Sequence, residues 1–351
     1  MNIVFRADAS PEIGTGHVMR CLTLAGRLHK SGHTITFVCG MMTEGLKRRI
    51  VDSGYSCYEI SGGIDNNTDS YIQDAQGTID LLKALDLRAD CLIVDHYGID
   101  EKWERLVKPN LRKLMVIDDL ANRRHQCDIL LDQNFYLDMQ ARYLNLVPPD
   151  CALFLGPEYA LLRPEFTQLA EEARRRDGSV KRILVSFGGS DPTNETEKVL
   201  RALKKVNGGN FQTDVAMGAA SPHLERIKDM CREMGVHLHI QVDYIAQLMQ
   251  IADLGIGSGG TTTWERMMMG LPSLTIIVAE NQRQITEDLA HIGAVINLGR
   301  HSEVTDYDIA REVTEMIEHP DRLLRVGEFA AQGILKVGNG VDRLIKALNG
   351  G

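Results

Sequence analysis

The sequence predicts an α/β protein with two Rossmann-like, doubly wound domains and a cleft between them. Short apolar runs alternate with amphipathic helical segments along the chain, a pattern that favours parallel sheets covered by helices on both faces. The length of 351 residues exceeds one ordinary hydrophobic core and suggests two domains. Glycine-rich turns that follow predicted strands in both halves fit the same class.

The first half, taken as a domain over 1–160, begins with a short apolar run that reads as a buried strand. A polar loop with two glycines follows, and a helical pattern opens at His17. The proline-containing stretch 136–159 is expected to be a loop near the domain boundary. The predicted strands are 3–5, 34–39, 56–60, 91–94, 114–117 and 129–132, and the predicted helices are 17–31, 44–53 and 71–86.

The second half, taken as a domain over 161–351, repeats the alternation after a charged segment, 171–177, that is expected to end a helix. The C-terminal stretch 306–348 has helical periodicity, and its last helix is a candidate to pack back on the first domain. The predicted strands are 183–187, 211–217, 236–241, 253–256 and 273–278, and the predicted helices are 194–206, 221–234, 245–251, 262–269 and 282–291.

Composition narrows the function classes. A net charge of −9 argues against a broad surface for nucleic acid or anionic membranes. No apolar run approaches the ~20 residues that span a bilayer, and the first residues read as a strand, not a signal peptide. The seven cysteines are scattered without a Cys-x-x-Cys pair, which favours reduced thiols and offers no metal or disulfide framework. We expect a cytoplasmic monomer.

The first glycine loop carries Gly14 and Gly16 and leads directly into His17. Glycines at a strand-to-helix turn let the backbone approach a ligand, and free N–H groups at a helix start favour anions. A histidine held neutral there by the helix dipole could act as a base on a phosphorylated or nucleotide-linked substrate. Alone the signal is weak, because the third glycine of a dinucleotide motif is missing and such a histidine is more often a cap or surface residue.

The strongest phosphate signal lies in the second half, where Ser258, Gly260, Thr261 and Thr262 follow a strand and precede a helix. Glycines and hydroxyl donors at such a turn suit a pyrophosphate. Glu265, one turn into the helix, can accept both ribose hydroxyls. The alternative is that Thr261 or Thr262 only caps the helix and Glu265 completes a capping arrangement. The functional interpretation is favoured because the turn is followed closely by Gly-Leu-Pro and by Glu-Asn-Gln.

Two further strand ends are candidates for the same crevice. The amides of Asn281 and Gln282 can read sugar hydroxyls or acetamido groups. Gly188 and Ser190 form a second glycine loop, but a plain capped turn explains them equally well.

The first half also places acidic residues at strand ends. Asp95 can orient an imidazole and Tyr97 can contact substrate, although a turn with a satisfied aspartate is as good an explanation. Asp118 and Asp119 could suggest a metal, but without a surrounding cluster of histidines or carboxylates a structural or orienting role is favoured.

Taken together, these motifs resemble a known family. The two doubly wound domains, the first-strand glycine loop and the Gly-Gly-Thr-Thr-Thr-x-Glu motif resemble the GT-B nucleotide-sugar enzymes, and most nearly the MurG-like N-acetylglucosaminyltransferases and their hydrolase relatives. The segment 5–22, with 94–97 and 280–282, is similar to the PseG family of UDP-2,4-diacetamido-2,4,6-trideoxy-β-L-altropyranose hydrolases. The resemblance covers essentially the whole chain, and its first motif is highly specific.

The resemblance implies that water removes UDP from the sugar with inversion at the anomeric carbon, in pseudaminic acid biosynthesis, without metal or cofactor. It implies that His17 is the general base that activates the water. Other positions follow their motifs: Tyr97, Asn281 and Gln282 for the diacetamido sugar, and Gly260, Thr261, Thr262 and Glu265 for UDP. The stereochemistry of the sugar stays open.

Two alternatives remain. A GT-B glycosyltransferase that uses a UDP-N-acetyl sugar shares much of the pattern. However, its Gly-Gly-Thr-Gly-Gly-His loop is replaced here by 11–17, and the first domain shows no evident apolar and basic patch for a lipid acceptor. A non-catalytic nucleotide-sugar-binding protein would leave His17 unexplained.

Overall fold

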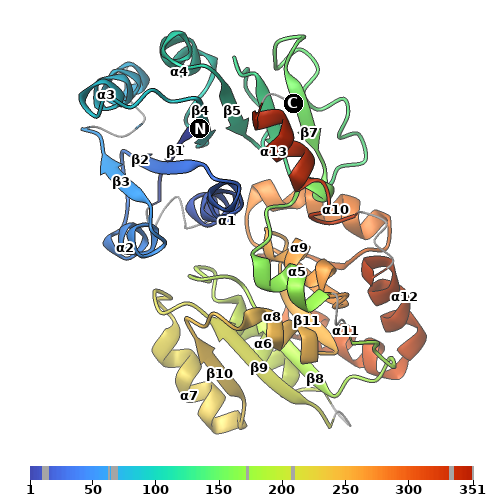
Figure 1. The fold of residues 1–351 in the computed structure, drawn as a ribbon. Helices are drawn as coiled ribbons and strands as arrows, with labels where there is room; N and C mark the ends of the chain where they lie inside the picture. Colours follow the sequence, from blue (N-terminus) through green and yellow to red (C-terminus); the bar gives the residue numbers. More distant parts are fainter. Residues whose placement is uncertain are drawn as a thin grey trace. The chain divides into compact units, whose positions relative to one another are not determined.

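The computed structural model describes residues 1–9, 16–61, 64, 70–170, 174–206, 210–331 and 336–349. The chain forms two compact units, each built on a parallel sheet (Figure 1). Neither unit is continuous in sequence. The first consists of Met1–Asn134, Asp138–Leu161 and Gly338–Gly351, and the second of Phe135–Leu137 and Leu162–Val337.

The first unit has seven strands in the order β3-β2-β1-β4-β5-β6-β7, and every neighbouring pair is parallel. The order reverses between β1 and β4, which makes the carboxyl ends of these strands the expected ligand site of a doubly wound sheet. The strands are β1 Asn2–Ala7, β2 Thr34–Cys39, β3 Ser56–Glu59, β4 Cys91–Asp95, β5 Leu114–Ile117, β6 Ile129–Asp132 and β7 Ala152–Leu155. The helices are α1 Gly16–Lys30, α2 Glu44–Asp52, α3 Ser70–Ala84, α4 Glu101–Val107 and α13 Val341–Asn349, with short 3₁₀ turns η1 Lys108–Asn110 and η2 Pro157–Tyr159.

The sheet of the first unit is buried on both faces, because its central strands are apolar at successive positions. Ile3 and Phe5 pack in one cluster with α1, α2 and α13, whereas Val4 packs in another with α3 and α4. The last helix of the chain, α13, thus shares a hydrophobic core with α1.

The second unit has six parallel strands in the order β10-β9-β8-β11-β12-β13. Helices α6, α7 and α11 pack in one cluster and α5, α8 and α9 in another. The strands are β8 Arg182–Ser186, β9 Gln212–Met217, β10 His237–Ile240, β11 Leu254–Ser258, β12 Ser273–Ile277 and β13 Ile296–Arg300. The helices are α5 Pro164–Ala170, α6 Glu195–Leu203, α7 Leu224–Met234, α8 Ile245–Ile251, α9 Thr262–Met268, α10 Arg283–His291, α11 Asp306–Glu318 and α12 Pro320–Ala331, with η3 Glu280–Gln282.

The predicted fold class is confirmed, and four local expectations are corrected. The stretch 136–159 is not only loop, because β7 pairs there with β6. Strand β13 and helix α4 have no counterpart among the predicted elements. Residues 174–177 are not helical, and 171–173 lie outside the described residues. None of the helices in the described part of the chain has the length and apolarity that a membrane crossing requires.

Close backbone packing at the carboxyl ends of β8 and β9 predicts a specific glycine requirement. A Cβ atom on Gly218 would lie 2.2 Å from the carbonyl oxygen of Gly189, so a backbone segment would have to move. We expect Gly218→Ala to lower the free energy of unfolding by about 1–3 kcal/mol in urea denaturation. Gly45→Ala in α2 is the control, because a Cβ there meets nothing within 4 Å. It should leave stability unchanged or raise it by up to about 1 kcal/mol. Equal effects of the two substitutions would contradict the steric argument.

Candidate active site

Asp95, the last residue of β4, is the centre of a buried polar cluster in the first unit. Its side chain is fully buried and bonds to two residues of α1. His17 Nδ1 lies 2.5 Å from Asp95 Oδ1. Arg20 donates to both carboxylate oxygens, from Nη2 to Oδ1 and from Nε to Oδ2, each at 2.6 Å. His17 and Arg20 are three positions apart and therefore lie on the same face of α1, so one carboxylate fixes both side chains.

The charge on Asp95 determines which nitrogen of His17 can act as a base. Burial alone would raise the pKa of Asp95, but the charges of Arg20 and His17 and their hydrogen bonds lower it below its ordinary value. An ionised carboxylate only accepts hydrogen bonds, so Nδ1 of His17 carries the proton in that contact. Whenever the ring is neutral its lone pair is then on Nε2, which is the arrangement of a histidine base oriented by a carboxylate.

Tyr97 and Asp119 extend the cluster around Asp95. The ring of Tyr97 meets the imidazole edge-on, with centroids 4.4 Å apart and planes at 83°. Arg20 also donates from Nη1 to Asp119 Oδ2 at 2.9 Å. The chain of contacts from His17 through Asp95 and Arg20 thus reaches Asp119. The orienting role favoured for Asp119 is consistent with this geometry.

A neighbouring network explains the charged residues of the first strand. Arg6, fully buried in β1, forms ion pairs with Asp8 and Asp74. Asp8 also accepts from the backbone N–H of Gly40 at 2.8 Å and faces His96 Nε2 at 3.3 Å. These bonds tie the carboxyl ends of β1, β2 and β4 together. Sequence reasoning assigned no role to Arg6 or Asp8, although charged residues within a buried strand signal such pairing.

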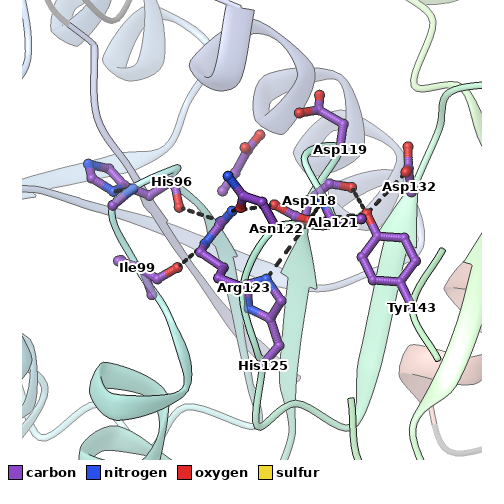
Figure 2. Close-up of polar contacts among 12 residues, drawn as sticks. His96, Ile99, Asp118, Asp119, Ala121, Asn122, Arg123, His125, Asp132 and Tyr143 are labelled. Carbon is purple, nitrogen blue, oxygen red and sulfur yellow. Dashed lines mark hydrogen bonds and ion pairs between the residues drawn. The ribbon is translucent and has the colours of Figure 1, made fainter. Parts of the chain in front are cut away.

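Figure 2 shows a third network, where Asp118 and Asp132 converge on the hydroxyl of Tyr143. Tyr143 Oη lies 3.1 Å from Asp118 Oδ2 and 3.0 Å from Asp132 Oδ2. Asp118 also pairs with Arg123 Nη1 at 2.8 Å and accepts from the N–H of Ala121. Burial opposes its ionisation, but Arg123 and His125 lower the pKa of Asp118 below its ordinary value.

Asp132 is in the opposite electrostatic situation. Burial, and then the charge of Asp119, raise the pKa of Asp132 to about 8. The geometry agrees, because Tyr143 has one hydroxyl proton and faces two carboxyl groups. A proton on Asp132 can be donated to the Tyr143 oxygen while Tyr143 donates to the ionised Asp118. In the described residues, no group of three or more His, Cys, Asp or Glu side chains is arranged to hold a metal ion.

In the second unit, the predicted phosphate loop follows β11 and is bonded by the side chain of Gln282. Gln282 Oε1 accepts from the N–H groups of Gly259 at 3.2 Å and Val278 at 3.3 Å. A Cβ on Gly259 would lie 2.1 Å from Thr286 Oγ1, so only glycine fits the observed turn. Thr261, at the start of α9, makes no side-chain capping bond. The structure therefore gives Gln282 a bracing contact with the loop.

Glu265 is buried in α9 and does not complete a capping arrangement. Its Oε1 lies 3.2 Å from Nη2 of Arg163, which also pairs with Glu165 and lies over the ring of Phe166. Burial raises the pKa of Glu265, an effect that Arg163 partly opposes. Arg163 was missed by sequence reasoning because it is 102 positions away in the chain.

The remaining predicted residues have the following places. Gly14 lies outside the described residues. Gly16 is the exposed first residue of α1. Gly188 adopts a φ of +86° and Ser190 is exposed, while Asp191 caps α6 by accepting from the N–H groups of Glu195 and Thr196. Asn281 is exposed in η3, and Ser258, at the end of β11, is buried.

Solved structures identify the fold class. MurG of Acinetobacter baumannii superposes with a TM-score of 0.70 at 16% identity, covering 100% of both chains. The calicheamicin glycosyltransferase CalG4 gives a TM-score of 0.63 at 15% identity, covering 99% of this chain and 98% of that one. The protein therefore has the GT-B-like fold of two Rossmann-like domains.

Within this fold, the chain resembles PseG. It is 29% identical over 295 residues to the UDP-2,4-diacetamido-2,4,6-trideoxy-β-L-altropyranose hydrolase of Campylobacter jejuni, covering 84% of this chain and 97% of that protein. Spore coat polysaccharide biosynthesis protein SpsG of Bacillus subtilis is 26% identical over 330 residues, with 92% and 91% covered. The uncharacterized protein MJ1062 of Methanocaldococcus jannaschii is 28% identical over 296 residues, and the chain spans 58% of its length. No family model matches the chain.

The buried Asp132 predicts an unusual pH dependence of stability. A carboxyl group with a pKa of about 8 in the folded protein holds a proton that the unfolded chain loses near pH ~4. Folding therefore binds a proton between these values, and stability falls as pH rises from about 4 to 8. We expect Asp132→Asn to flatten this decline in urea unfolding at pH 5 to 8, by up to about 1.4 kcal/mol per pH unit. The exposed Asp138→Asn is the control, and parallel profiles for Asp132→Asn and the unchanged protein would contradict the protonated state.

Proposed function

We propose that the protein hydrolyses UDP-2,4-diacetamido-2,4,6-trideoxy-β-L-altropyranose to UDP and the free sugar, with inversion at the anomeric carbon. The observation that carries the proposal is the contact of His17 with the buried, ionised Asp95. The similarity to the Campylobacter hydrolase over most of both chains supports the choice of substrate. Its place would be in pseudaminic acid biosynthesis, which serves the glycosylation of flagellin or surface glycans.

In the proposed reaction, His17 Nε2 takes a proton from water as the water oxygen attacks the anomeric carbon. The bond from that carbon to the diphosphate oxygen breaks, and its electron pair leaves with UDP. Attack from the face opposite the leaving group gives inversion. Asp95 holds the ring in the required tautomer and stabilises the imidazolium that forms. Base catalysis of this kind contributes about 10²- to 10⁴-fold in rate, and we propose that no metal is needed.

We further propose that the second unit holds UDP. Ser258, Gly260, Thr261 and Thr262 would surround the diphosphate, and Glu265 would accept the ribose hydroxyls. Displacement of Arg163 from Glu265 would be part of that binding, because these two side chains bond to each other. Gly14, Gly16, Gly188 and Ser190 are assigned to the substrate by their loop positions, and Tyr97, Asn281 and Gln282 to the sugar.

Proton NMR of the protein with this UDP-sugar, in buffer containing EDTA, tests the reaction. Release of UDP and of the sugar in water alone, with the inverted anomer appearing first, is the expected result. Release only after an acceptor is added would assign the protein to the glycosyltransferases of the same fold. Binding without release under both conditions would identify a nucleotide-sugar-binding protein.

Replacement of His17 tests the base directly. We expect His17→Ala to bind UDP as tightly as the unchanged protein and to lose about 10²- to 10⁴-fold in kcat. The matched control is His29→Ala, which removes an exposed imidazole from the same helix and should leave kcat unchanged. Turnover retained by His17→Ala in the NMR assay would remove His17 from the role of base.

Asp95 acts through His17 and is therefore a positioning residue. We expect Asp95→Asn to lower kcat by at least about 10²-fold with little change in KM, because an amide can donate to Nδ1 and favour the wrong tautomer. Asp119→Asn is the comparison, because it removes the negative charge that pairs with Arg20 and keeps the carboxylate of Asp95 that bonds to His17. The pH profile of kcat separates the roles: it should change shape for Asp95→Asn. A loss of stability with an unchanged profile would indicate a structural role only.

A further inference from the structure

Arg266 lies buried in α9 beneath the loop that follows β11. Its side chain is 3% exposed, and it donates from Nη2 to the carbonyl oxygen of Ser258 at 2.8 Å. It also donates from Nε to Ser273 Oγ at 3.0 Å, and from its terminal nitrogens to Thr262 Oγ1 and Thr263 Oγ1, both at 3.2 Å. The guanidinium is thus joined to both ends of the segment from Ser258 to Thr262.

Strand β11 is shaped to admit this side chain. A Cβ on Gly255 would lie 3.1 Å from Arg266 Cδ, and a Cβ on Gly257 would lie 2.8 Å from its Nη1. Residues two apart on a strand face the same side. The two glycines therefore leave a slot over β11 in which the arginine lies. Glycine weakens the interior of a strand. The two glycines therefore indicate that β11 is shaped to accommodate the side chain of Arg266.

Among the described residues no carboxylate forms an ion pair with Arg266, although the charge of the adjacent Glu265 favours its ionised form. Its hydrogen-bond acceptors among the described residues are a carbonyl and three hydroxyls, all neutral, and none of their carboxylates lies within 4.0 Å. The carboxylate of the adjacent Glu265 bonds to Arg163 instead. Burial lowers the pKa of Arg266 to about 10, an effect that the charge of Glu265 partly opposes. In contrast, the buried Arg6 and Arg20 each pair with two aspartates.

A second, partly buried guanidinium in the same unit bonds only to backbone carbonyls among the described residues. Arg176 donates to the carbonyl oxygens of Met249, Ala252, Met269 and Gly270. These carbonyls end α8 and α9, where partial negative charge compensates a cation. Arg266 instead bonds to Thr262 and Thr263 at the start of α9, where the helix supplies no such negative charge. A buried charge without a paired carboxylate is costly, so a negative group near the loop would stabilise Arg266.

We propose that Arg266 is a positioning residue for a bound diphosphate: it fixes the loop from below and supplies the positive charge that a nucleoside diphosphate balances. This inference rests on the proposed function, because it takes the loop as the UDP site. The guanidinium is turned to the protein side of the loop, bonded to Ser258 and Thr262. Its charge therefore acts through the loop, and favours the extra negative charge that UDP gains as the sugar departs.

The test compares two ligands that differ only in the diphosphate. Binding of UDP and of uridine is measured by titration calorimetry for the unchanged protein, Arg266→Met and Arg266→Lys. We expect Arg266→Met to weaken UDP binding about 10- to 100-fold and to change uridine binding less than about twofold. Arg266→Lys keeps the charge and fits the same slot, so it should retain most of the preference for UDP. It also keeps the test valid if the methionine variant does not fold.

The matched control is Arg176→Met, which removes a partly buried guanidinium of the same unit. It should lower the unfolding temperature but leave the ratio of the two affinities unchanged. An unchanged ratio of the UDP and uridine affinities in the Arg266 variants would overturn the proposed role of its charge. Absence of UDP binding by the unchanged protein would overturn both this inference and the proposed nucleotide site. UDP binding without sugar hydrolysis would overturn the proposed reaction alone.

Discussion

The bond between the Asp95 carboxylate and α1 is the interaction on which the first unit's polar cluster depends. Asp95 ends the central strand β4, and its two oxygens hold His17 and Arg20 on one face of the helix that follows β1. The carboxylate is fully buried, so these contacts are not weakened by solvent. The same bonds join β4 to α1 and set the tautomer of the histidine. The Asp95 carboxylate therefore fixes both the position of the helix and the tautomer of its histidine.

The two units treat buried charge differently. In the first, each buried arginine meets carboxylates, Asp118 pairs with Arg123 and faces His125, and burial raises the pKa of Asp132. In the second, Arg266 meets only neutral acceptors among the described residues. Where the buried charges of a unit are paired with one another, a histidine among them can be held in one tautomer. A unit with a buried guanidinium that has no paired carboxylate is suited to binding an anion.

Much of this organisation could be predicted from the sequence, for physical reasons that also explain the failures. Central strands such as β4 are buried on both faces and stand out as apolar runs, and Asp95 follows directly. The missed strands β7 and β13 are edge strands with partly exposed residues, so their apolar signal is weak. Pairs such as Arg163 with Glu265 join distant segments, and no local pattern reveals them. Arg20 was within the recognised motif, but its role required knowing where β4 lies.

The glycines of the second unit show how a loop is fixed by what lies beneath it. A side chain at Gly257 would collide with Arg266 and with the carbonyl of Ser186, and one at Gly259 would collide with Thr286. Because the neighbours already occupy that space, the loop after β11 has little freedom before any ligand binds. The N–H group of Gly259 bonds to Gln282 and the hydroxyl of Thr262 bonds to Arg266, and these contacts further restrict the loop. Glycine is required here for close packing, and not for flexibility.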